Sequence, residues 1–213
     1  MKHCYQLPAG GESFRAEIEI KRSRFISIIE RVANDEQARG FIDRVRAEFP
    51  DARHHCSAYI YRVERANPVE RSSDDGEPGG TAGKPILDVL SGSGMHDLAC
   101  VVVRYFGGIK LGAGGLVHAY SQAASDALEQ VDRRWRCLRN LYEVSFSHAD
   151  AQKYEAELRA KNIAITDTQY GAEVTYTLAI SPDDFEQLES QLAALTAGTA
   201  QLVEAGTAWA EKR

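Results

Sequence analysis

The sequence predicts an α+β protein divided into two domains. Apolar residues follow the two-residue repeat of strands in some segments and the 3.6-residue repeat of helices in others. Glycine is concentrated in one stretch, because 11 of the 17 glycines fall between residues 73 and 120. Net charge changes along the chain: residues 1–140 carry 20 Lys+Arg against 19 Asp+Glu, and residues 141–213 carry 5 against 12. At 213 residues the chain is long enough for two cores.

The first elements form a hairpin and a helix. Residues 14–32 alternate apolar and polar positions in two blocks around K-R-S-R, which predicts two strands joined by a basic turn at residues 21–24. Asn34 is the expected N-cap of a helix, because Gln37 follows three residues later and apolar positions recur on one face. Pro50 ends this helix, whose apolar face we expect to pack in the core.

The middle of the chain alternates apolar segments with glycine-rich ones. Pro is favoured in the first turn of a helix, and a continuous apolar run indicates a buried strand. The elements expected are a strand at 54–61, a long loop at 62–83, a helix from about Pro85 to Gly92, a buried strand at 97–106, a loop at 107–115 and a helix from Leu116.

The pattern restarts after a charged segment. Residues 131–140 are expected to carry the preceding helix into a domain boundary. The elements expected beyond it are a strand at 141–147, a helix at 149–161, strands at 163–170 and 172–180, a helix at 182–196 and a strand at 199–205. The order βαββαβ is that of the ferredoxin-like fold.

Composition indicates a cytoplasmic protein without a membrane segment. No run approaches about 20 apolar residues, and the first ten residues lack the apolar core of a signal peptide. The four cysteines, Cys4, Cys56, Cys100 and Cys137, form no C-x-x-C pair, so we interpret them as free and mostly buried thiols. The first part of the chain is the better candidate for an anionic partner, although charge alone does not establish nucleic-acid binding.

An acidic turn offers two interpretations. Asp74, Asp75 and Glu77 lie within four residues, so they could hold a divalent cation or supply a general base. The alternative is a solvated turn whose aspartates accept hydrogen bonds from nearby backbone N–H groups. The closing glutamate of a calcium-binding loop is missing, which favours the turn.

Two features suggest phosphate binding without forming a complete motif. Lys84 follows Gly83 as in a phosphate-binding loop, but Pro85 stands where that motif has Ser or Thr. The glycine-rich segment 112–116 begins a helix and could hold an anion through free amides. Tight packing of this segment on the strand is the alternative.

Arg104 and Tyr105 alternate at the end of a strand, so one faces the core side and the other faces outward. An exposed Arg104 would join Lys84 and Lys110 in a phosphate-contacting patch. A buried Arg104 would need a carboxylate partner, for which Asp74 or Asp75 is the expected residue.

The histidines give little support for a metal site. His54 and Cys56 fall on the same face of the expected strand and supply only one pair of ligands, so we expect no metal. His55 points to the other face and could act as a pH-sensitive or basic group, but no nucleophile accompanies it at a diagnostic spacing.

Two long motifs resemble the YigZ/IMPACT family. They are S-D-D-G-E-P-G-G-T-A-G-K-P at 73–85 and V-R-Y-F-G-G-I-K-L-G-A-G-G-L-V-H-A-Y at 103–120, and P-D-A-R-H-H-C at 50–56 fits as well. The resemblance implies an IMPACT-type domain at 1–135 with the α/β fold of one domain of a small-subunit ribosomal protein and of GHMP-type kinases. It implies a companion domain at 140–213 that is similar to the last domain of elongation factor G.

The resemblance implies a binding role in translation. Eukaryotic members of the family are implicated in translational control, although they carry a different accessory domain. We therefore expect a non-enzymatic protein with no catalytic residues and no cofactor, whose partner is RNA, the ribosome or a translation-associated protein and not DNA. The expected binding residues are Arg53, His54, His55, Ser73, Asp74, Asp75, Glu77, Thr81, Lys84, Arg104, Tyr105, Gly107, Gly108, Lys110, Gly112 and Gly114.

The alternative function is an enzyme acting on a phosphorylated small molecule. The loop at 107–115 would then cradle the phosphate with Lys84 or Lys110, and Asp74, Asp75 or His55 would act as the base.

Overall fold

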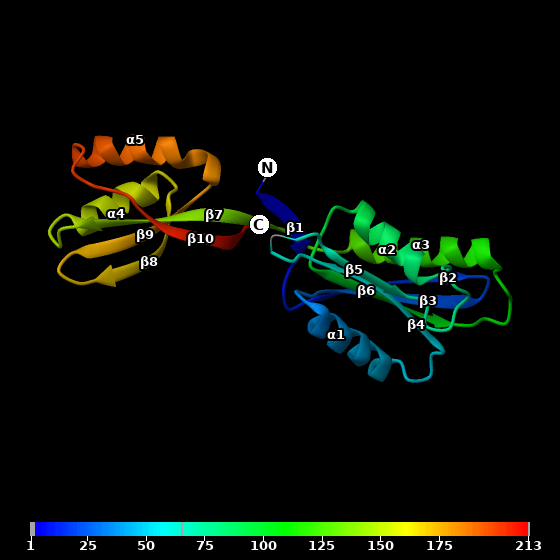
Figure 1. Ribbon diagram of the computed structural model, residues 1–213. Helices are drawn as coiled ribbons and strands as arrows, with labels where there is room; N and C mark the ends of the chain where they lie inside the picture. The colour runs from blue at the N-terminus through cyan, green and yellow to red at the C-terminus, as the bar shows by residue number, and fades with distance from the viewer. Residues whose placement is uncertain (1–2, 65, 213) are drawn as a thin grey trace. The chain divides into compact units, whose positions relative to one another are not determined.

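A computed structural model describes residues 3–64 and 66–212. The chain divides into two compact units, one formed by Tyr5–Trp135 and the other by residues 136–212 together with the segment that ends at Cys4. Both units contain a sheet and helices, as an α+β protein of two domains requires (Figure 1). We call them the first and the second domain. None of the described helices is long and apolar enough to cross a bilayer.

The first domain is built on a five-stranded antiparallel sheet. Its strands follow the order β2-β3-β6-β4-β5. They are β2 (Ser13–Ile20), β3 (Ser23–Arg31), β6 (Leu98–Tyr105), β4 (His54–Tyr61) and β5 (Val69–Ser73). The hairpin predicted at 14–32 is confirmed, and its turn places Lys21 and Arg22 in the left-handed region of backbone space, with φ values of 49° and 64°.

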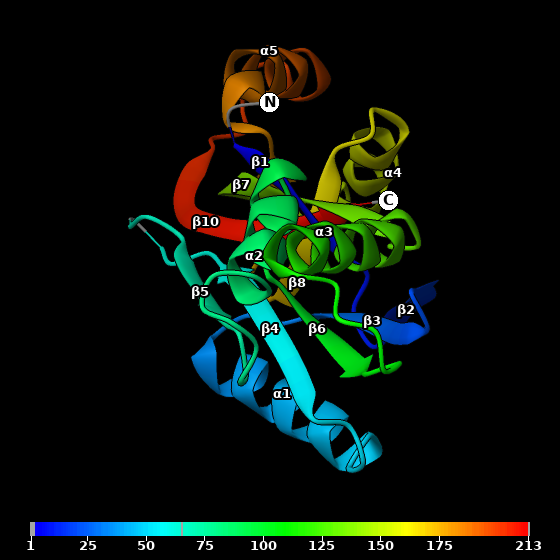
Figure 2. The same cartoon turned by 90° about the vertical axis from the view of Figure 1, so that its right-hand side faces the viewer.

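Helices cover both faces of this sheet. Figure 2 shows α1 (Asp35–Glu48) on the opposite side of the sheet from α2 (Gly83–Gly92) and α3 (Ala113–Glu129). The predicted cap of α1 is confirmed, since the side chain of Asn34 accepts a hydrogen bond from the Gln37 N–H at 2.9 Å.

Strand β6 lies at the centre of the sheet and is buried on both faces. Leu98, Cys100 and Val102 belong to the core under α2 and α3, whereas the intervening Ala99, Val101 and Val103 belong to the core under α1. By the same alternation Arg104 lies on the α2/α3 side and Tyr105 on the α1 side. The prediction that these two residues face opposite ways is confirmed.

Two glycine-rich connections leave this framework. We call residues 74–82, between β5 and α2, the first glycine loop, and residues 106–112, between β6 and α3, the second glycine loop. The prediction of a long loop at 62–83 is wrong in part, because this segment contains strand β5. This edge strand is exposed at four of its five positions and so has the polar sequence of a loop. Helix α3 begins at Ala113, three residues before the predicted start, so Gly114 and Gly115 lie in its first turn despite their low helix propensity.

The second domain follows the predicted βαββαβ order. Its elements are β7 (Arg133–Phe146), α4 (Ala151–Ala160), β8 (Ala164–Tyr170), β9 (Val174–Ile180), a 3₁₀ turn at Pro182–Asp184, α5 (Phe185–Thr196) and β10 (Val203–Lys212). Strands β7 and β8 both pair antiparallel with β9, and β10 pairs with the other side of β7. The resulting order β10-β7-β9-β8 is that of the ferredoxin-like fold.

Strand β1 was not predicted, and β7 begins earlier than predicted. Strand β1 (Cys4–Pro8) pairs with β7, and β7 itself begins at Arg133, so the expectation that 131–140 continues a helix is wrong. The charged sequence of this segment suits a partly buried strand, because arginine can bury its aliphatic stem and keep its charge in water. The last strand starts at Val203, four residues later than predicted.

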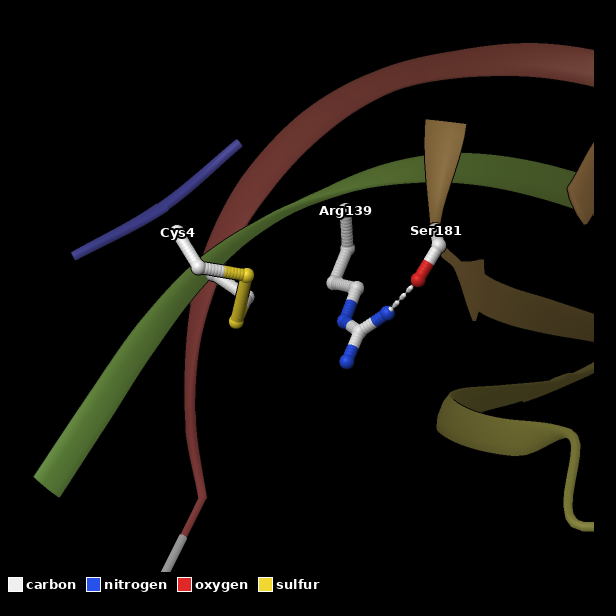
Figure 3. Close-up of a disulfide and its surroundings, with 4 residues drawn as sticks. Cys4, Arg139 and Ser181 are labelled. Carbon is white, nitrogen blue, oxygen red and sulfur yellow. Dashed lines mark hydrogen bonds between the residues drawn. A yellow bond between two sulfur atoms is a disulfide. The ribbon is translucent and has the colours of Figure 1, made fainter. Parts of the chain in front are cut away.

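The structure also corrects the cysteine interpretation. Cys4 on β1 and Cys137 on β7 form a disulfide, with their Cα atoms 4.1 Å apart (Figure 3). The pairing of β1 with β7 brings these residues together across 133 positions of sequence, which spacing alone could not reveal. Cys56 and Cys100 are free and buried as expected. Close to the disulfide, the side chain of Arg139 donates a hydrogen bond to the Ser181 hydroxyl.

Candidate functional site

Two close backbone contacts fix the positions of the glycine loops. A Cβ atom on Gly83 would lie 2.7 Å from the backbone of Ser73, so the start of α2 packs directly on the end of β5. A Cβ atom on Gly107 would lie 2.0 Å from the carbonyl group of Arg22, so the second glycine loop packs on the tip of the basic hairpin. Glycine is required at both positions because no side chain would fit.

A pocket of about 410 Å³ opens between the two glycine loops. The ends of β4 and β6, both glycine loops and the first turn of α3 contribute to its wall. Its lining residues are Arg53, His54, Glu77, Pro78, Arg104, Phe106, Lys110, Leu111, Gly112, Ala113 and Leu116. The volume lies within the range of small-molecule and group-binding sites in proteins.

A buried ion pair forms one part of the pocket wall. Arg104 is 6% exposed, and its Nη1 atom donates to the Glu77 carboxylate at 2.5 Å. The Tyr120 hydroxyl donates to the same carboxylate oxygen at 2.8 Å. Arg104 is therefore buried and paired, and its partner is Glu77 rather than the expected Asp74 or Asp75. Glu77 ends the turn that begins at Asp74, and Pro78 follows it. Its pairing with Arg104 at the end of β6 could not be read from sequence distance.

The guanidinium group of Arg104 keeps one donor unused. Its Nε atom is buried and has no hydrogen-bond partner among residues 3–64 and 66–212. Its Nη2 atom reaches the Ser23 hydroxyl only at 3.5 Å. The rings of Phe25 and Phe106 lie 5.5 and 5.6 Å from its Cζ atom. A buried donor without a partner costs about 1–3 kcal/mol, so this arrangement is a candidate for completion by a ligand.

The accessible part of the pocket is cationic. Arg53 and Lys110 are exposed, and neither forms a hydrogen bond or ion pair with the described residues. With Arg104 they supply three cationic side chains against the single carboxylate of Glu77, which Arg104 already neutralises.

Helix α3 points its N-terminus into the same wall. Its N-cap residue is Gly112, which has a φ of 76° and supplies no side-chain cap. The first N–H groups of a helix have no intrahelical partner and carry the positive end of the helix dipole. Gly112 and Ala113 both line the pocket, so these amides add to the positive field of Arg53 and Lys110.

Asp74 organises the first glycine loop and does not line the pocket. Its carboxylate accepts hydrogen bonds from the backbone N–H groups of Gly80 at 2.8 Å, Ala82 at 3.0 Å and Gly83 at 2.8 Å. Partial burial opposes ionisation of Asp74, but these three donors outweigh it and hold its pKa below the ordinary value. The interpretation of this segment as a turn with backbone-bound aspartates is thereby confirmed for Asp74.

Asp75 also serves the fold. Its carboxylate pairs with Arg46 of α1 at 2.6 Å and accepts the backbone N–H of His55 at 2.7 Å. The His55 ring is buried and its Nε2 atom lies 3.0 Å from the Phe49 carbonyl oxygen. Neither Asp75 nor His55 lines the pocket, whereas His54 does, with its Nδ1 atom 2.9 Å from the Asp75 carbonyl oxygen.

The remaining candidates in and beside the first glycine loop, Ser73, Thr81 and Lys84, lie outside the pocket lining. Lys84 is exposed on α2 and pairs with Asp88 one turn later at 2.6 Å. The Thr81 hydroxyl donates to the Pro78 carbonyl at 2.7 Å. The Ser73 hydroxyl accepts from the Asp75 N–H at 3.3 Å.

Among the candidates from the second loop, Lys110 and Gly112 line the pocket, and Gly107, Gly108 and Gly114 do not. Gly107 and Gly108 shape the loop, the former by its contact with Arg22 and the latter by a φ of 82°. Tyr105 lies on the other face of the sheet, with Arg24 stacked 5.8 Å from its ring.

Two buried groups beneath the pocket remain protonated near neutral pH. Burial is the main cause that raises the pKa of the Cys56 thiol to about 12; its contact with Tyr120 lowers this pKa, and the nearby carboxylates raise it. Burial also raises the pKa of Tyr120, and its contacts with Cys56 and Glu77 act in the same direction. The Cys56 thiol is therefore not present as a nucleophilic thiolate.

The sequence analysis missed five lining residues, Pro78, Phe106, Leu111, Ala113 and Leu116. The Phe106 side chain is 54% exposed, so its ring is accessible from the pocket. The two-residue repeat could have identified it, since Phe106 follows Arg104 on the same face of the strand end. The described residues contain no group of three or more His, Cys, Asp or Glu side chains placed to hold a metal ion.

Comparisons with known proteins place this pocket inside a shared domain. Residues 21–128 match the Impact N-terminal domain, and residues 144–199 match a domain of unknown function, DUF1949. The chain is 39% identical over 185 residues to the IMPACT family member YigZ of Escherichia coli, covering 87% of this chain and 91% of YigZ. It is 34% identical over 201 residues to the IMPACT family member YvyE of Bacillus subtilis, covering 94% and 92%.

One solved structure is similar to nearly the whole chain. A crystal structure of a hypothetical protein is 36% identical, covers 95% of this chain and 98% of its own, and superposes with a TM-score of 0.62. The two-domain translational regulator Yih1 is 23% identical, covers 58% and 48%, and has a TM-score of 0.40, which is too low to indicate function.

Proposed function

The chain belongs to the IMPACT family, and from that premise we propose that it is a non-enzymatic binding protein of the translation apparatus that contacts RNA through its pocket. The observation that carries the proposal is the convergence of Arg53, Lys110, the α3 N-terminus and the exposed ring of Phe106 at one opening. A role in translation places the protein in the cytoplasm.

The family supports a role in translation. The resemblance implies translational control for the eukaryotic members, and a Protein IMPACT homolog of Dictyostelium discoideum is 30% identical to this chain over 100 residues. That similarity covers 46% of this chain and 28% of the homolog.

RNA fits the surface better than a protein partner does. Proteins that bind single strands combine cationic side chains for the phosphates with aromatic rings on which bases stack. Lys110 and Arg53 supply the charges, and Phe106 supplies the ring. The contact of Gly107 with Arg22 also places the basic hairpin tip beside the second glycine loop, and Lys21 and Arg22 are exposed there.

The proposal is tested by measuring the binding of a fluorescent single-stranded RNA at several salt concentrations. Affinity should fall with salt, and Lys110→Ala should reduce the slope of log K against log salt by about 0.7, the value for one phosphate contact on a single strand. Lys153→Ala is the matched control, because Lys153 is an exposed lysine on α4 of the second domain. An absence of both salt-dependent RNA binding and co-sedimentation with ribosomes would refute the RNA role and direct the search to a protein partner.

One observation favours an enzyme as the second candidate function. The pocket is large enough for a phosphorylated small molecule, and its cations could hold the phosphate. The groups expected to act as a base, however, are engaged elsewhere, since Asp74 binds backbone amides, Asp75 binds Arg46 and the ring of His55 is buried. A rise in melting temperature with a phosphorylated metabolite, together with its chemical conversion, would support this candidate over RNA binding.

A further inference from the structure

We infer that the pocket binds the terminal phosphate of a nucleotide, with the attached base against Phe106. This inference rests on the proposed function for its site, and it names the chemical group that the site recognises. The same group occurs at a phosphorylated end of an RNA and in a free nucleoside monophosphate.

The first step of the argument is charge. A phosphate monoester carries a charge between about −1.5 and −2 at neutral pH, whereas an internal phosphodiester carries one negative charge. The pocket offers Arg53, Lys110 and the uncapped N-terminus of α3, and its one carboxylate, Glu77, is already neutralised by Arg104 at 2.5 Å. An additional dianion therefore meets a net positive site.

The second step is the unused donor of Arg104. Arg104 is only 6% exposed, and it lines the pocket. Its Nε–H group has no hydrogen-bond partner among the described residues. The observation is independent of the helix terminus, because it concerns a different element, strand β6. A phosphate oxygen accepts hydrogen bonds from guanidinium groups with favourable geometry, and Arg104 is the guanidinium group in the pocket lining that keeps a donor without an acceptor among the described residues.

The third step is the shape of the site. Arg104 and Glu77 have side chains that are 7% and 4% exposed, so they close the inner wall of the pocket. A chain terminus can enter such a pocket and stop at this wall. An internal phosphate would need room for the polynucleotide to continue on both sides.

The fourth step is the position of Phe106. The ring is 54% exposed although it lies only 5.6 Å from the Cζ atom of Arg104. A base attached to the bound phosphate can stack on this exposed ring, and base stacking on aromatic side chains tolerates every base. The site therefore recognises a nucleotide end without selecting its sequence.

The experiment compares oligoribonucleotides of one sequence that carry a 5′-phosphate, a 3′-phosphate or no terminal phosphate. Binding to the full-length protein is measured by fluorescence anisotropy, and adenosine monophosphate and adenosine serve as competitors. We expect one phosphorylated end to bind at least about tenfold more tightly than the unphosphorylated RNA, as charge-assisted hydrogen bonds to a dianion predict.

Variants assign the preference to the pocket. Lys110→Ala and Phe106→Ala change exposed residues, so we expect both variants to fold, which circular dichroism checks. Each should reduce the preference for a phosphorylated end by at least about fivefold, whereas Lys153→Ala in the second domain should leave it unchanged.

The outcomes separate this inference from the proposed function. Salt-dependent RNA binding without any preference for a phosphorylated end would overturn the inference and leave the RNA role intact. Binding of adenosine monophosphate over adenosine that Lys110→Ala abolishes, without RNA binding, would support the inference with a free nucleotide as the source and overturn the RNA role. A preference that survives both pocket variants would overturn the inference, because the phosphate would then bind elsewhere.

Discussion

The two glycine loops of the first domain have similar compositions, but their polar side chains differ in what they contact. In the first glycine loop Asp74 binds three backbone amides, Asp75 binds Arg46, and Glu77 binds Arg104 and Tyr120. In the second glycine loop the side chains of Phe106, Ile109 and Lys110 are exposed.

This difference separates a loop whose side chains stabilise the fold from the loop for which we propose a binding role. The acidic side chains of the first glycine loop bind backbone amides, Arg46, Arg104 and Tyr120 within the domain, so they are not available to a ligand. The side chains of the second glycine loop are exposed next to the uncapped N-terminus of α3. These side chains and the first N–H groups of the helix are therefore accessible to a ligand. A high glycine content is common to both loops and does not distinguish these roles.

The largest expected effect on stability comes from Glu77→Ala in the first glycine loop. The change leaves Arg104 buried without its counter-ion, which typically costs about 3–5 kcal/mol. Urea unfolding of the wild type and the variant measures this loss of unfolding free energy. Glu48→Ala is the control, because it breaks the exposed pair with Arg15 and should cost about 1 kcal/mol or less. Equal losses in the two variants would contradict a structural role for Glu77.

Paired glycine substitutions test which backbone contacts hold the second glycine loop. Gly107→Ala places a Cβ atom 2.0 Å from the Arg22 carbonyl group and should destabilise the protein by about 1–3 kcal/mol. Gly114→Ala adds a Cβ atom with no neighbour within 4 Å in the first turn of α3, and should stabilise by about 0.5–1 kcal/mol. The two melting temperatures should therefore move in opposite directions. A shift in the same direction would show that the contact with the hairpin tip does not fix this loop.

Asp74→Ala tests the backbone hydrogen bonds of the first glycine loop. Loss of an acceptor for three N–H groups should cost about 1–2 kcal/mol at neutral pH, as for the loss of a helix cap. Because the folded pKa of Asp74 lies below its ordinary 3.8, its ionisation stabilises the fold at and above about pH 4. This contribution disappears as the pH falls through the folded pKa.

The difference in unfolding free energy between the wild type and Asp74→Ala should therefore be largest near pH 7 and should shrink as the pH falls below 3.8 and through the folded pKa of Asp74. Asp74→Asn, which keeps one carbonyl acceptor, should lose less stability than Asp74→Ala. A difference that stays constant between pH 3 and pH 7 would rule out the ionised carboxylate as its source.

The smallest effect on stability is expected when either of two exposed lysines, Lys84 or Lys110, is replaced by alanine. The two variants are compared for RNA binding. Neither Lys84→Ala nor Lys110→Ala should shift the urea midpoint appreciably, because both residues are exposed. Lys110→Ala should weaken RNA binding several-fold, whereas Lys84→Ala, outside the pocket and next to Asp88, should have a smaller effect. Equal effects in an anisotropy titration would extend the binding surface to α2.

Much of the fold could be predicted because its signals are local. The Asn34 cap, the hairpin around residues 21–24 and the βαββαβ order each depend on periodicity or on residues a few positions apart. Strand β1 was missed because it is short and its partner β7 lies far along the chain. Strand β5 was missed because its sequence is polar, although its partner β4 is the preceding strand.

The site could be predicted only in part. The motif placed Arg53, His54, Glu77, Arg104, Lys110 and Gly112 among the candidates, and all of them line the pocket. Sequence could not separate Glu77, which pairs with Arg104, from Asp74 and Asp75, because all three are acidic residues of one turn. Their partners are set by the packing of β4, β6 and α1, which no local pattern encodes.

The disulfide between Cys4 and Cys137 makes most of the chain a covalent ring that encloses the whole first domain. A protease that cuts one peptide bond inside the ring, for instance in the second glycine loop, releases no fragment. The two pieces stay linked on a denaturing gel and separate only when a reductant is added. In a reducing compartment the ring opens, and the same single cut then divides the protein.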